Sequence, residues 1–208
     1  MSAPASAPPV GKRERTKASN RAAILEAARD VFAELGYDAA TVRDVIRRTD
    51  LASGTFYNYF PDKESVLRAL LEESSREMRA RVGDARAEAR SLEEFVGHAY
   101  RAYFDFLVED RPTFDLLRRN AGTIRALMDE PALGAAAVDD LIADLREAIG
   151  RGEMPALDAE YMAAAMAGAG LEVAIRMIER DPPDVEGAAA FATALFLGGI
   201  ERLGHPAR

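Results

Sequence analysis

Apolar residues recur along the chain at the three- and four-residue spacing that is typical of amphipathic helices. Near the start, Ile24, Ala28 and Val31 follow this spacing, and Gly36 is a residue type that commonly ends a helix. The pattern predicts a first helix over residues 20–35. Its apolar stripe is expected to bury the back of the helices that follow.

Two short helices are predicted next. The first carries Val42, Val45 and Ile46 on one face, and Thr41 precedes it as an N-cap whose hydroxyl can satisfy a free backbone N–H. The second covers residues 53–60. Two short helices joined by about four residues are typical of a helix-turn-helix, whose second helix enters the major groove of DNA.

The second of these helices is expected to expose a polar face. Phe56 and Phe60 can anchor the helix inward. The remaining surface is small and able to form hydrogen bonds, and it consists of Ser53, Gly54, Thr55, Tyr57 and Asn58. Small residues allow the backbone to approach a duplex, Thr and Asn read base edges, and Tyr suits phosphate oxygens. The alternative is that this aromatic segment is only a core element.

Three segments carry a resemblance to a known family. They are TVRDV at residues 41–45, GTFYNYF at residues 54–60 and DKE at residues 62–64. Together they resemble the DNA-binding module of the TetR family of one-component regulators. The resemblance runs from residue 20 to residue 67, which is about a quarter of the chain.

This resemblance implies an organisation into domains. We expect a three-helix DNA-binding domain with a helix-turn-helix over residues 19–71. A long helix then joins it to an all-α domain over residues 72–208 that binds an effector and dimerises. Residues 1–18 are expected to be a disordered basic tail, because the first eleven have almost nothing to bury. The basic end of this tail either keeps the chain soluble or touches the DNA backbone or minor groove.

The predicted DNA contacts come from the exposed face of the second short helix, from neighbouring basic residues and from the resemblance. They are Lys17, Arg21, Thr41, Arg43, Ser53, Gly54, Thr55, Tyr57, Asn58, Tyr59 and Lys63. The role of Lys63 as an exposed phosphate contact is what the resemblance implies. Two positions depart from the family pattern. Asp50 stands where Gly is usual, which suggests a left-handed or bridging conformation, and Ser53 stands where Lys is common.

The distribution of charge changes the first impression that the chain gives. The net charge of the 208 residues is −8, which seems unfavourable for a nucleic-acid partner. Residues 1–60, however, hold nine Lys or Arg and seven Asp or Glu, whereas residues 61–208 hold eighteen and twenty-eight. A locally positive end on an acidic body can still engage phosphates.

The composition argues against several other classes of function. The chain has no Cys and two His residues, so we expect no disulfide, no metal site and no cofactor. No nucleophile–base pair, paired-carboxylate signature or phosphate loop is apparent, which disfavours an enzyme. No apolar run approaches the roughly 20 residues that span a bilayer, and no secretory signal is visible. We therefore expect a cytoplasmic protein without a membrane partner.

Beyond residue 91 the pattern is helical, without strand-like alternation. Helices are predicted over residues 91–110, 113–129, 133–149, 158–180 and 184–203. Aromatic residues concentrated early in this region suggest an effector pocket, a use that the resemblance also implies. The candidate lining residues are His98, Tyr100, Tyr103, Phe104, Leu107, Phe114, Leu117, Arg118, Met128, Met162, Met166 and Glu172. The alternatives are an ordinary aromatic core and, for Glu172, an intrahelical ion pair with Arg176.

The last two predicted helices are rich in very small residues, which allow close helix approach. We interpret them as an antiparallel pair that forms a four-helix dimer interface with a second copy. The candidate interface residues are Ala169, Val173, Met177, Ala188, Ala192, Leu195, Phe196 and Gly199. The alternative is packing within one chain only.

The leading hypothesis is a homodimeric DNA-binding transcriptional regulator, more consistent with a repressor than an activator. A small lipophilic effector is expected to release it from a near-palindromic operator. Two other classes stay open: an adaptor that keeps the helix-turn-helix but binds a protein, and a helical enzyme.

Overall fold

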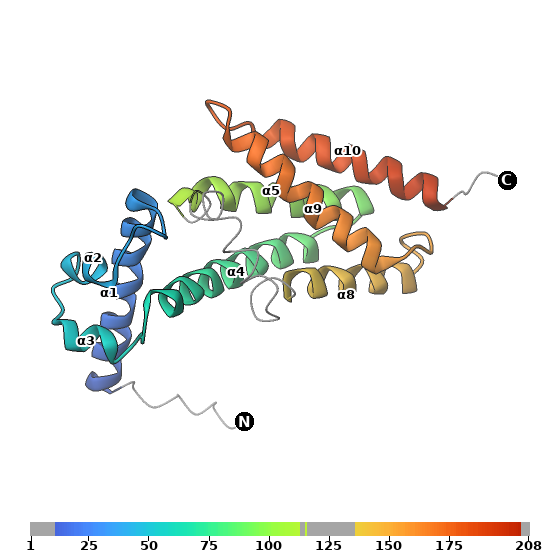
Figure 1. The fold of residues 1–208 in the computed structure, drawn as a ribbon. Helices are drawn as coiled ribbons and strands as arrows, with labels where there is room; N and C mark the ends of the chain where they lie inside the picture. The colour runs from blue at the N-terminus through green and yellow to red at the C-terminus, as the bar shows by residue number, and fades with distance from the viewer. Residues whose placement is uncertain (1–10, 113–114, 116–135, 205–208) are drawn as a thin grey trace, which may run out of the picture. The chain divides into compact units, whose positions relative to one another are not determined.

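The structure is a computed structural model that describes residues 11–112, 115 and 136–204. Every regular element in these ranges is helical and none is a strand, which confirms the predicted all-α class (Figure 1). The helices are α1 (Lys12–Leu35), α2 (Val42–Arg47), α3 (Ser53–Tyr57), α4 (Lys63–Ala87), α5 (Leu92–Glu109), α8 (Ala136–Gly150), α9 (Ala159–Ile178) and α10 (Val185–Gly204). The chain divides into two compact units, Met1–Leu70 and Leu71–Arg208.

The first helix begins earlier than predicted. α1 starts at Lys12, so the expected disordered tail over residues 1–18 is wrong from residue 12 onward. Lys, Arg, Glu and Ala in this stretch are good helix formers, and Gly11 provides an extended residue before them. The predicted end is confirmed: Gly36 has φ 78°, a left-handed conformation that glycine adopts without steric cost.

The core of the first unit is formed by long stripes of α1 and α4 and by a few side chains from α2 and α3. Its buried members include Ile24, Ala28, Val31, Phe32, Val45, Phe56, Phe60, Val66, Leu67 and Leu70. Among the described residues, α2 and α3 bury only Val45 and Phe56 within their helical spans. Such short helices bury little surface, so hydrogen bonds at the α2 cap and in the connecting turn add to the packing of these side chains.

The long helix α4 begins in the first unit and continues into the second, where it ends at Ala87. Its second half contributes half-buried Met78 to the core of the second unit. Arginines on this half also pair with neighbouring helices. The pairs are Arg79 with Asp140 and Arg86 with Asp144 on α8, and Arg81 with Glu109 on α5.

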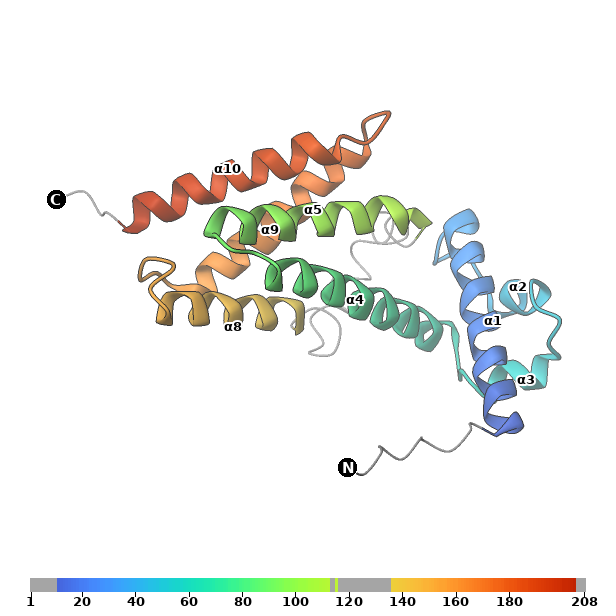
Figure 2. The same cartoon turned by 180° about the vertical axis from the view of Figure 1, so that it is seen from behind.

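In the second unit, α5 lies along α10, and α9 contacts α8, α10 and α5 (Figures 1 and 2). The predicted bounds of α5, α9 and α10 agree with the structure to within two residues. The predicted helix over residues 133–149 is described from Ala136 to Gly150. The predicted helix over residues 113–129 lies outside the described residues, apart from the single residue Asp115.

Polar side chains set where α5 and α9 begin. Ser91 Oγ accepts the N–H of Glu94 at 3.1 Å and so caps the start of α5. The Glu94 carboxylate accepts the N–H of Arg90 rather than that of Ser91, so the capping box is only half formed. At α9, Asp158 Oδ1 accepts the N–H groups of Glu160 and Tyr161.

An aromatic column forms the centre of the second unit. The ring of Tyr100 stacks between those of Phe104 and Phe196, at centroid distances of 5.7 and 5.9 Å. Its hydroxyl donates to the carbonyl oxygen of Met166 at 2.9 Å. Gly170 makes this approach possible, because a Cβ there would lie 3.0 Å from Cε1 of Tyr100.

The helix α9 is unusually apolar for one that is mostly exposed. By length and composition alone it could cross a membrane, and it is the one such helix in the described ranges. Only 39% of its most apolar window is buried within the chain. Much of its apolar surface therefore lacks a covering element among the described residues.

Candidate nucleic-acid interface and effector domain

The helix α3 is shorter than predicted. It ends at Tyr57 rather than residue 60, and the next two residues form a tight turn. In this turn the N–H of Asn58 donates to the carbonyl of Thr55, and the N–H of Tyr59 donates to the carbonyl of Phe56. Such i to i+3 bonds are common where a helix ends. The turn keeps Asn58 exposed beside Tyr57.

Two buried aromatic rings orient α3. Phe56 and Phe60 are 1% and 5% exposed, and their ring centroids lie 6.2 Å apart, as the predicted inward anchoring requires. The guanidinium of Arg21 lies 5.5 Å from the Phe60 ring. With these anchors inside, Ser53, Gly54, Tyr57 and Asn58 are exposed, while Thr55 and Tyr59 are half-buried.

The helix α2 is capped by its own first turn. Thr41 Oγ1 accepts the N–H of Asp44 at 3.3 Å, and the Asp44 carboxylate accepts the backbone N–H of Thr41 at 3.0 Å. Hydrogen bonds from Thr41 hold the pKa of Asp44 below its usual value. Arg43 is exposed beside this cap. The predicted N-cap is therefore confirmed, and the Thr41 hydroxyl is engaged within its own helix.

The turn between α2 and α3 is held by Thr49. Its hydroxyl donates to the carbonyl of Ile46 at 2.9 Å and accepts the N–H of Leu51 at 3.3 Å. No described residue other than glycine has a positive φ, so the left-handed conformation suggested for Asp50 is wrong. The threonine side chain closes the turn instead, which sequence reasoning missed.

Lys63 is not the exposed phosphate contact that was predicted. It is half-buried, and Nζ donates to the carbonyls of Tyr37, Asp38 and Ala40 at 2.8, 3.1 and 3.0 Å. The ammonium also lies 4.5 Å from the Tyr37 ring. An ammonium group has three N–H donors, and these three carbonyls occupy all of them. Lys63 thus ties the segment after α1 to the start of α4.

The first turns of α1 lie beside the end of α3. A shallow depression is lined by Arg13, Glu14, Thr16, Lys17, Asn58 and Tyr59. It brings together three of the predicted DNA contacts, Lys17, Asn58 and Tyr59. Arg13 was predicted only as part of the basic end of the tail. It lies four residues before Lys17 and eight before Arg21, which places all three on one helix face.

Most of the predicted effector-pocket residues that the structure describes belong to the core. Tyr100, Phe104, Leu107, Met162 and Met166 are buried, and Tyr103 is half-buried. Burial raises the pKa of Tyr103 to about 12. Four other predicted residues, Phe114, Leu117, Arg118 and Met128, lie outside the described residues.

His98 and Glu172 do not face this core. Both are exposed in the described part of the chain, so neither belongs to the buried aromatic cluster. The alternative of a Glu172–Arg176 ion pair is also wrong, because Arg176 pairs with Glu179 at 3.0 Å. Since α5 and α9 bury other faces, these polar side chains are left on the solvent side.

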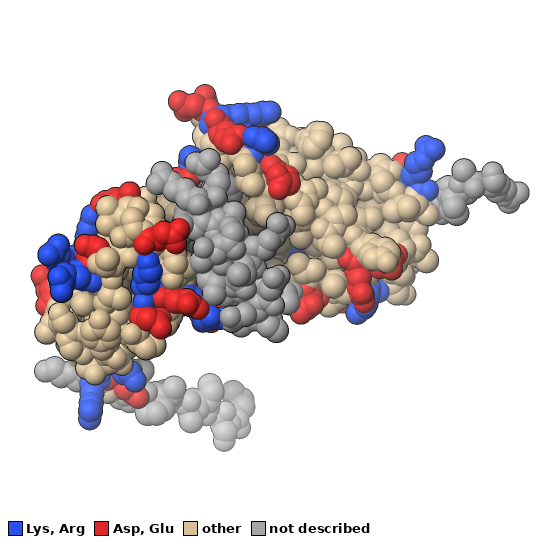
Figure 3. Space-filling model, viewed as in Figure 1, with Lys and Arg blue, Asp and Glu red and all other residues tan. Residues whose placement is uncertain are grey.

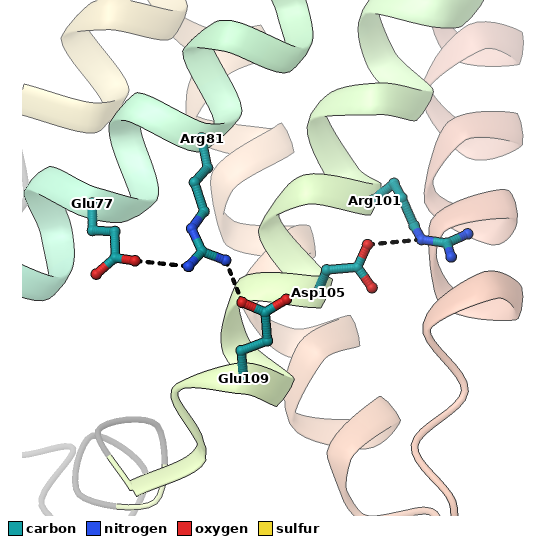
Figure 4. A network of polar contacts seen from close by, with 5 residues as sticks. All are labelled: Glu77, Arg81, Arg101, Asp105 and Glu109. Carbon is teal, nitrogen blue, oxygen red and sulfur yellow. Dashed lines mark hydrogen bonds and ion pairs between the residues drawn. The ribbon is translucent and has the colours of Figure 1, made fainter.

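Exposed ion pairs link the surfaces of several helices (Figure 4). Arg81 of α4 pairs with Glu77 of its own helix and with Glu109 of α5. Arg101 of α5 pairs with Asp105 of the same helix. Arg101 also pairs with Glu186 on α10. Exposed pairs of this kind contribute little to stability, because water and salt screen the charges. They mark contacts between the helices rather than a site.

The second unit exposes a broad surface of small and apolar residues on α9 and α10, which we call the apolar face (Figure 3). It consists of Tyr161, Ala164, Ala165, Gly168 and Leu171 on α9 and Ala190, Phe191, Ala194, Leu195 and Gly198 on α10. Two of the predicted interface residues, Leu195 and Gly199, are exposed here. Large side chains such as Phe191, 60% exposed, are uncommon on a surface without a partner.

Four of the other predicted interface residues face the core of the second unit. Met177, Ala188, Ala192 and Phe196 are buried in the core of the second unit, and Ala169 and Val173 are half-buried. Small residues occupy both sides of α9 and α10, so their spacing does not reveal which side faces inward. The exposed apolar residues therefore lie on a different side of α9 and α10 from most of the predicted interface residues.

The first unit matches a described family. Residues 24–70 match the family model for bacterial regulatory proteins of the tetR family. The chain is also 31% identical over 121 residues to the HTH-type transcriptional repressor AcnR from Corynebacterium glutamicum. That match covers 58% of this chain and 57% of the relative, so the chain spans less than two thirds of the relative's length.

Solved structures extend the similarity over both units. The fatty acid degradation regulator FadR from Bacillus halodurans superposes with a TM-score of 0.76 at 25% identity, covering 93% of this chain and 98% of that one. FadR from Bacillus subtilis, in complex with stearoyl-CoA, superposes with a TM-score of 0.68 at 24% identity, covering 90% and 99%. The fold of the whole chain is therefore that of these regulators.

Proposed function

Since this chain belongs to the tetR family of bacterial regulatory proteins through its N-terminal domain, we propose that it is a homodimeric repressor. It acts in the cytoplasm on a near-palindromic operator and carries out no chemical reaction itself. A small lipophilic effector releases it from the operator. The observation that carries the proposal is the exposed face of α3, whose polar residues are oriented outward by buried Phe56 and Phe60.

The α3 face has the properties that a major-groove reader needs. Tyr57 is 58% exposed, and Asn58 offers an amide that can pair with a base edge. A Cβ added at Gly54 would meet no protein atom within 4 Å, and Gly54 does not have a positive φ. The fold itself therefore does not require glycine there, whereas close approach to a duplex does.

Basic residues on α1 supply phosphate contacts beside α3. Arg13, Lys17 and Arg21 lie four residues apart along one side of the helix, and Arg13 and Lys17 share a depression with Asn58. Phosphate contacts fix the register of a protein on DNA, and base contacts then specify the sequence. This division assigns positioning to α1 and sequence reading to α3.

The apolar face of α9 and α10 supports the homodimer. A two-fold axis would pack this pair of helices against the same pair of a second copy, which forms a four-helix interface. The small residues Ala164, Gly168, Ala194 and Gly198 allow close approach, and Phe191 becomes buried. Charged side chains are absent from the ten residues that define the face.

We propose a fatty acyl group as the effector class. FadR of Bacillus halodurans is a fatty acid degradation regulator, and FadR of Bacillus subtilis was crystallised with stearoyl-CoA. The second unit of this chain is rich in aromatic and thioether side chains that suit an acyl chain. Binding would favour a form in which the two α3 helices no longer lie one DNA turn apart, about 34–36 Å.

The test is selection of bound duplexes from a random DNA pool by the purified full-length protein at moderate salt. The expected result is a near-palindrome. On the selected duplex, the double variant Tyr57→Phe/Asn58→Ala should bind at least ~10-fold more weakly, because it removes hydrogen bonds to bases and phosphate. Thermal unfolding of the variant serves as the control for folding. No recovered sequence preference, or unchanged binding by a folded double variant, would refute the proposal and favour an adaptor.

A further inference from the structure

A polar chamber opens within the second unit, where the last turn of α4, the first turn of α5 and the end of α8 meet. Its volume is about 460 Å³. Six charged residues line it: Arg86, Arg90, Asp144, Glu147, Arg151 and Glu153. Leu92, Phe95 and Ala148 provide an apolar part of its wall. None of these residues belongs to the apolar face or to the predicted effector pocket.

The chamber is lined by three arginines and three carboxylates, but the three carboxylates are not each paired with a different arginine. The Arg151 guanidinium donates to both carboxylate oxygens of Glu153, at 2.9 and 2.8 Å, and also to Glu147. Those three residues therefore satisfy one another. Arg90 lies two residues before α5 and makes no side-chain ion pair within the described ranges. Its backbone N–H, not its guanidinium, donates to the Glu94 carboxylate. The Arg90 guanidinium is thus unpaired among the described residues, whereas two carboxylates share Arg151, so the six charges together are neutral.

Arg86 is the second under-compensated cation. Its side chain is only 10% exposed, and its Nε lies 2.8 Å from Oδ2 of Asp144. The N–H does not point at that oxygen, so Nε has no hydrogen-bond partner in the described part of the chain. A buried donor without an acceptor is unfavourable, and more so when it is charged.

The electrostatic balance of the Arg86–Asp144 pair agrees with this geometry. Burial lowers the pKa of Arg86 and raises the pKa of Asp144, and in both cases it outweighs the attraction between the two groups. A single carboxylate therefore does not compensate for the loss of water around Arg86. The Phe95 ring, 5.9 Å from the guanidinium, adds a weak cation–π contact but no acceptor.

We propose that this chamber binds the oxyanion group, carboxylate or phosphate, of a small amphipathic molecule. Arg86 donates to the oxyanion from the wall, and Arg90 adds a second positive charge. A short apolar segment of the ligand lies against Leu92 and Phe95. Guanidinium groups suit this task because their N–H donors match the oxygens of carboxylate and phosphate.

Occupation of the chamber would also change how α4 is held. The oxyanion competes with Asp144 for Arg86 and so weakens one of the two ion pairs between α4 and α8, the other being Arg79 with Asp140 at 2.8 Å. Since α4 is one continuous helix that starts in the DNA-binding domain, this step offers a route to the operator. Only this consequence rests on the proposed function; the binding itself does not.

The test uses isothermal titration calorimetry on the full-length protein. Octanoate and octyl phosphate are the two oxyanion probes, and octanol is the uncharged probe of the same chain length. One or both anions should bind with one site per chain, at least tenfold more tightly than octanol. Comparison of the two anions distinguishes a carboxylate from a phosphate ligand. Absence of anion binding, or equal binding of octanol, would overturn the proposal.

Variants then locate the site. Arg86→Gln should weaken anion binding at least tenfold, and Arg90→Gln by a smaller factor of three or more. The matched control is Arg101→Gln, which removes an α5 arginine whose ion pairs lie outside the chamber. If Arg86→Gln does not fold, Arg90→Gln decides. Unchanged affinity in the folded chamber variants would refute the location. Binding of the protein to its operator is measured separately, in the absence of the anionic probes. If the protein does not bind an operator but does bind the anions, the proposed function is rejected and the proposed anion site is retained.

Discussion

Two exposed faces of this chain lack a partner within the described residues, and their chemistry is opposite. The α3 face presents hydroxyl, amide and phenol groups around Gly54, whereas the apolar face presents Ala, Gly and large apolar side chains. The first suits a hydrated, charged partner, and the second suits a dry surface like itself. In the proposed function, the first face recognises DNA and the second joins two copies of the chain.

The largest effect is expected when the apolar face is broken. Leu195→Glu would place two carboxylates in the dimer interface, one from each copy, at a cost of about 3 kcal/mol or more each. The variant should stay folded but sediment as a monomer, and its affinity for the operator should fall with the loss of the dimer.

Leu35→Glu is a matched control for this change. Leu35 is 51% exposed and Leu195 is 52% exposed, but Leu35 lies on α1 and is not one of the residues of the apolar face. The Leu35→Glu variant should sediment as a dimer, like the unsubstituted protein. A dimeric Leu195→Glu, or a monomeric Leu35→Glu, would contradict the assignment of the interface.

A smaller effect is expected for a substitution of Lys63, the first residue of α4. Lys63→Met removes charge-assisted hydrogen bonds to three carbonyls and should lower the free energy of unfolding by about 2 kcal/mol. Urea denaturation of the full chain, followed by circular dichroism, measures this loss. Lys17→Met, at an exposed lysine, should change stability by less than about 0.5 kcal/mol. Equal losses in the two variants would show that Lys63 has no special structural role.

The smallest effect is expected at Gly54, where stability and binding should move in opposite directions. Gly54→Ala has open space for its Cβ and should stabilise the helix by roughly 0.5–1 kcal/mol. The added methyl should nevertheless weaken operator binding, because it lies between the backbone and the duplex. Thermal unfolding and a gel-shift titration test the two halves. Unchanged operator affinity would mean that Gly54 does not approach DNA closely.

The two faces also differ in how well the sequence predicts them. The α3 face follows from a local motif, in which Phe56 and Phe60 are the obvious anchors and the remaining residues must point outward. The apolar face depends on the rotation of α9 and α10. Met177 and Phe196 were predicted to lie in the interface but are buried in the core. Small residues occur on all sides of both helices, so the spacing of apolar residues does not show which side is buried.

Other errors share one physical cause, which is that tertiary contacts decide the use of a polar side chain. Lys63 looked exposed from its position in the first turn of a helix, but three carbonyls from the segment after α1 surround it. Arg86 appeared to be one more charge on a charged helix. Its burial beside Asp144 and Phe95 depends on how α5 and α8 pack, which no spacing along α4 reveals.

The central claim is that the two faces work together, so that two copies joined through the apolar face read one two-fold operator. The most direct measurement is sedimentation of the full-length protein with the selected duplex and with a duplex in which one half-site is scrambled. We predict two chains on the intact duplex and a weakening of at least ~100-fold on the half-site. One chain per duplex, or equal affinity for both duplexes, would contradict the account.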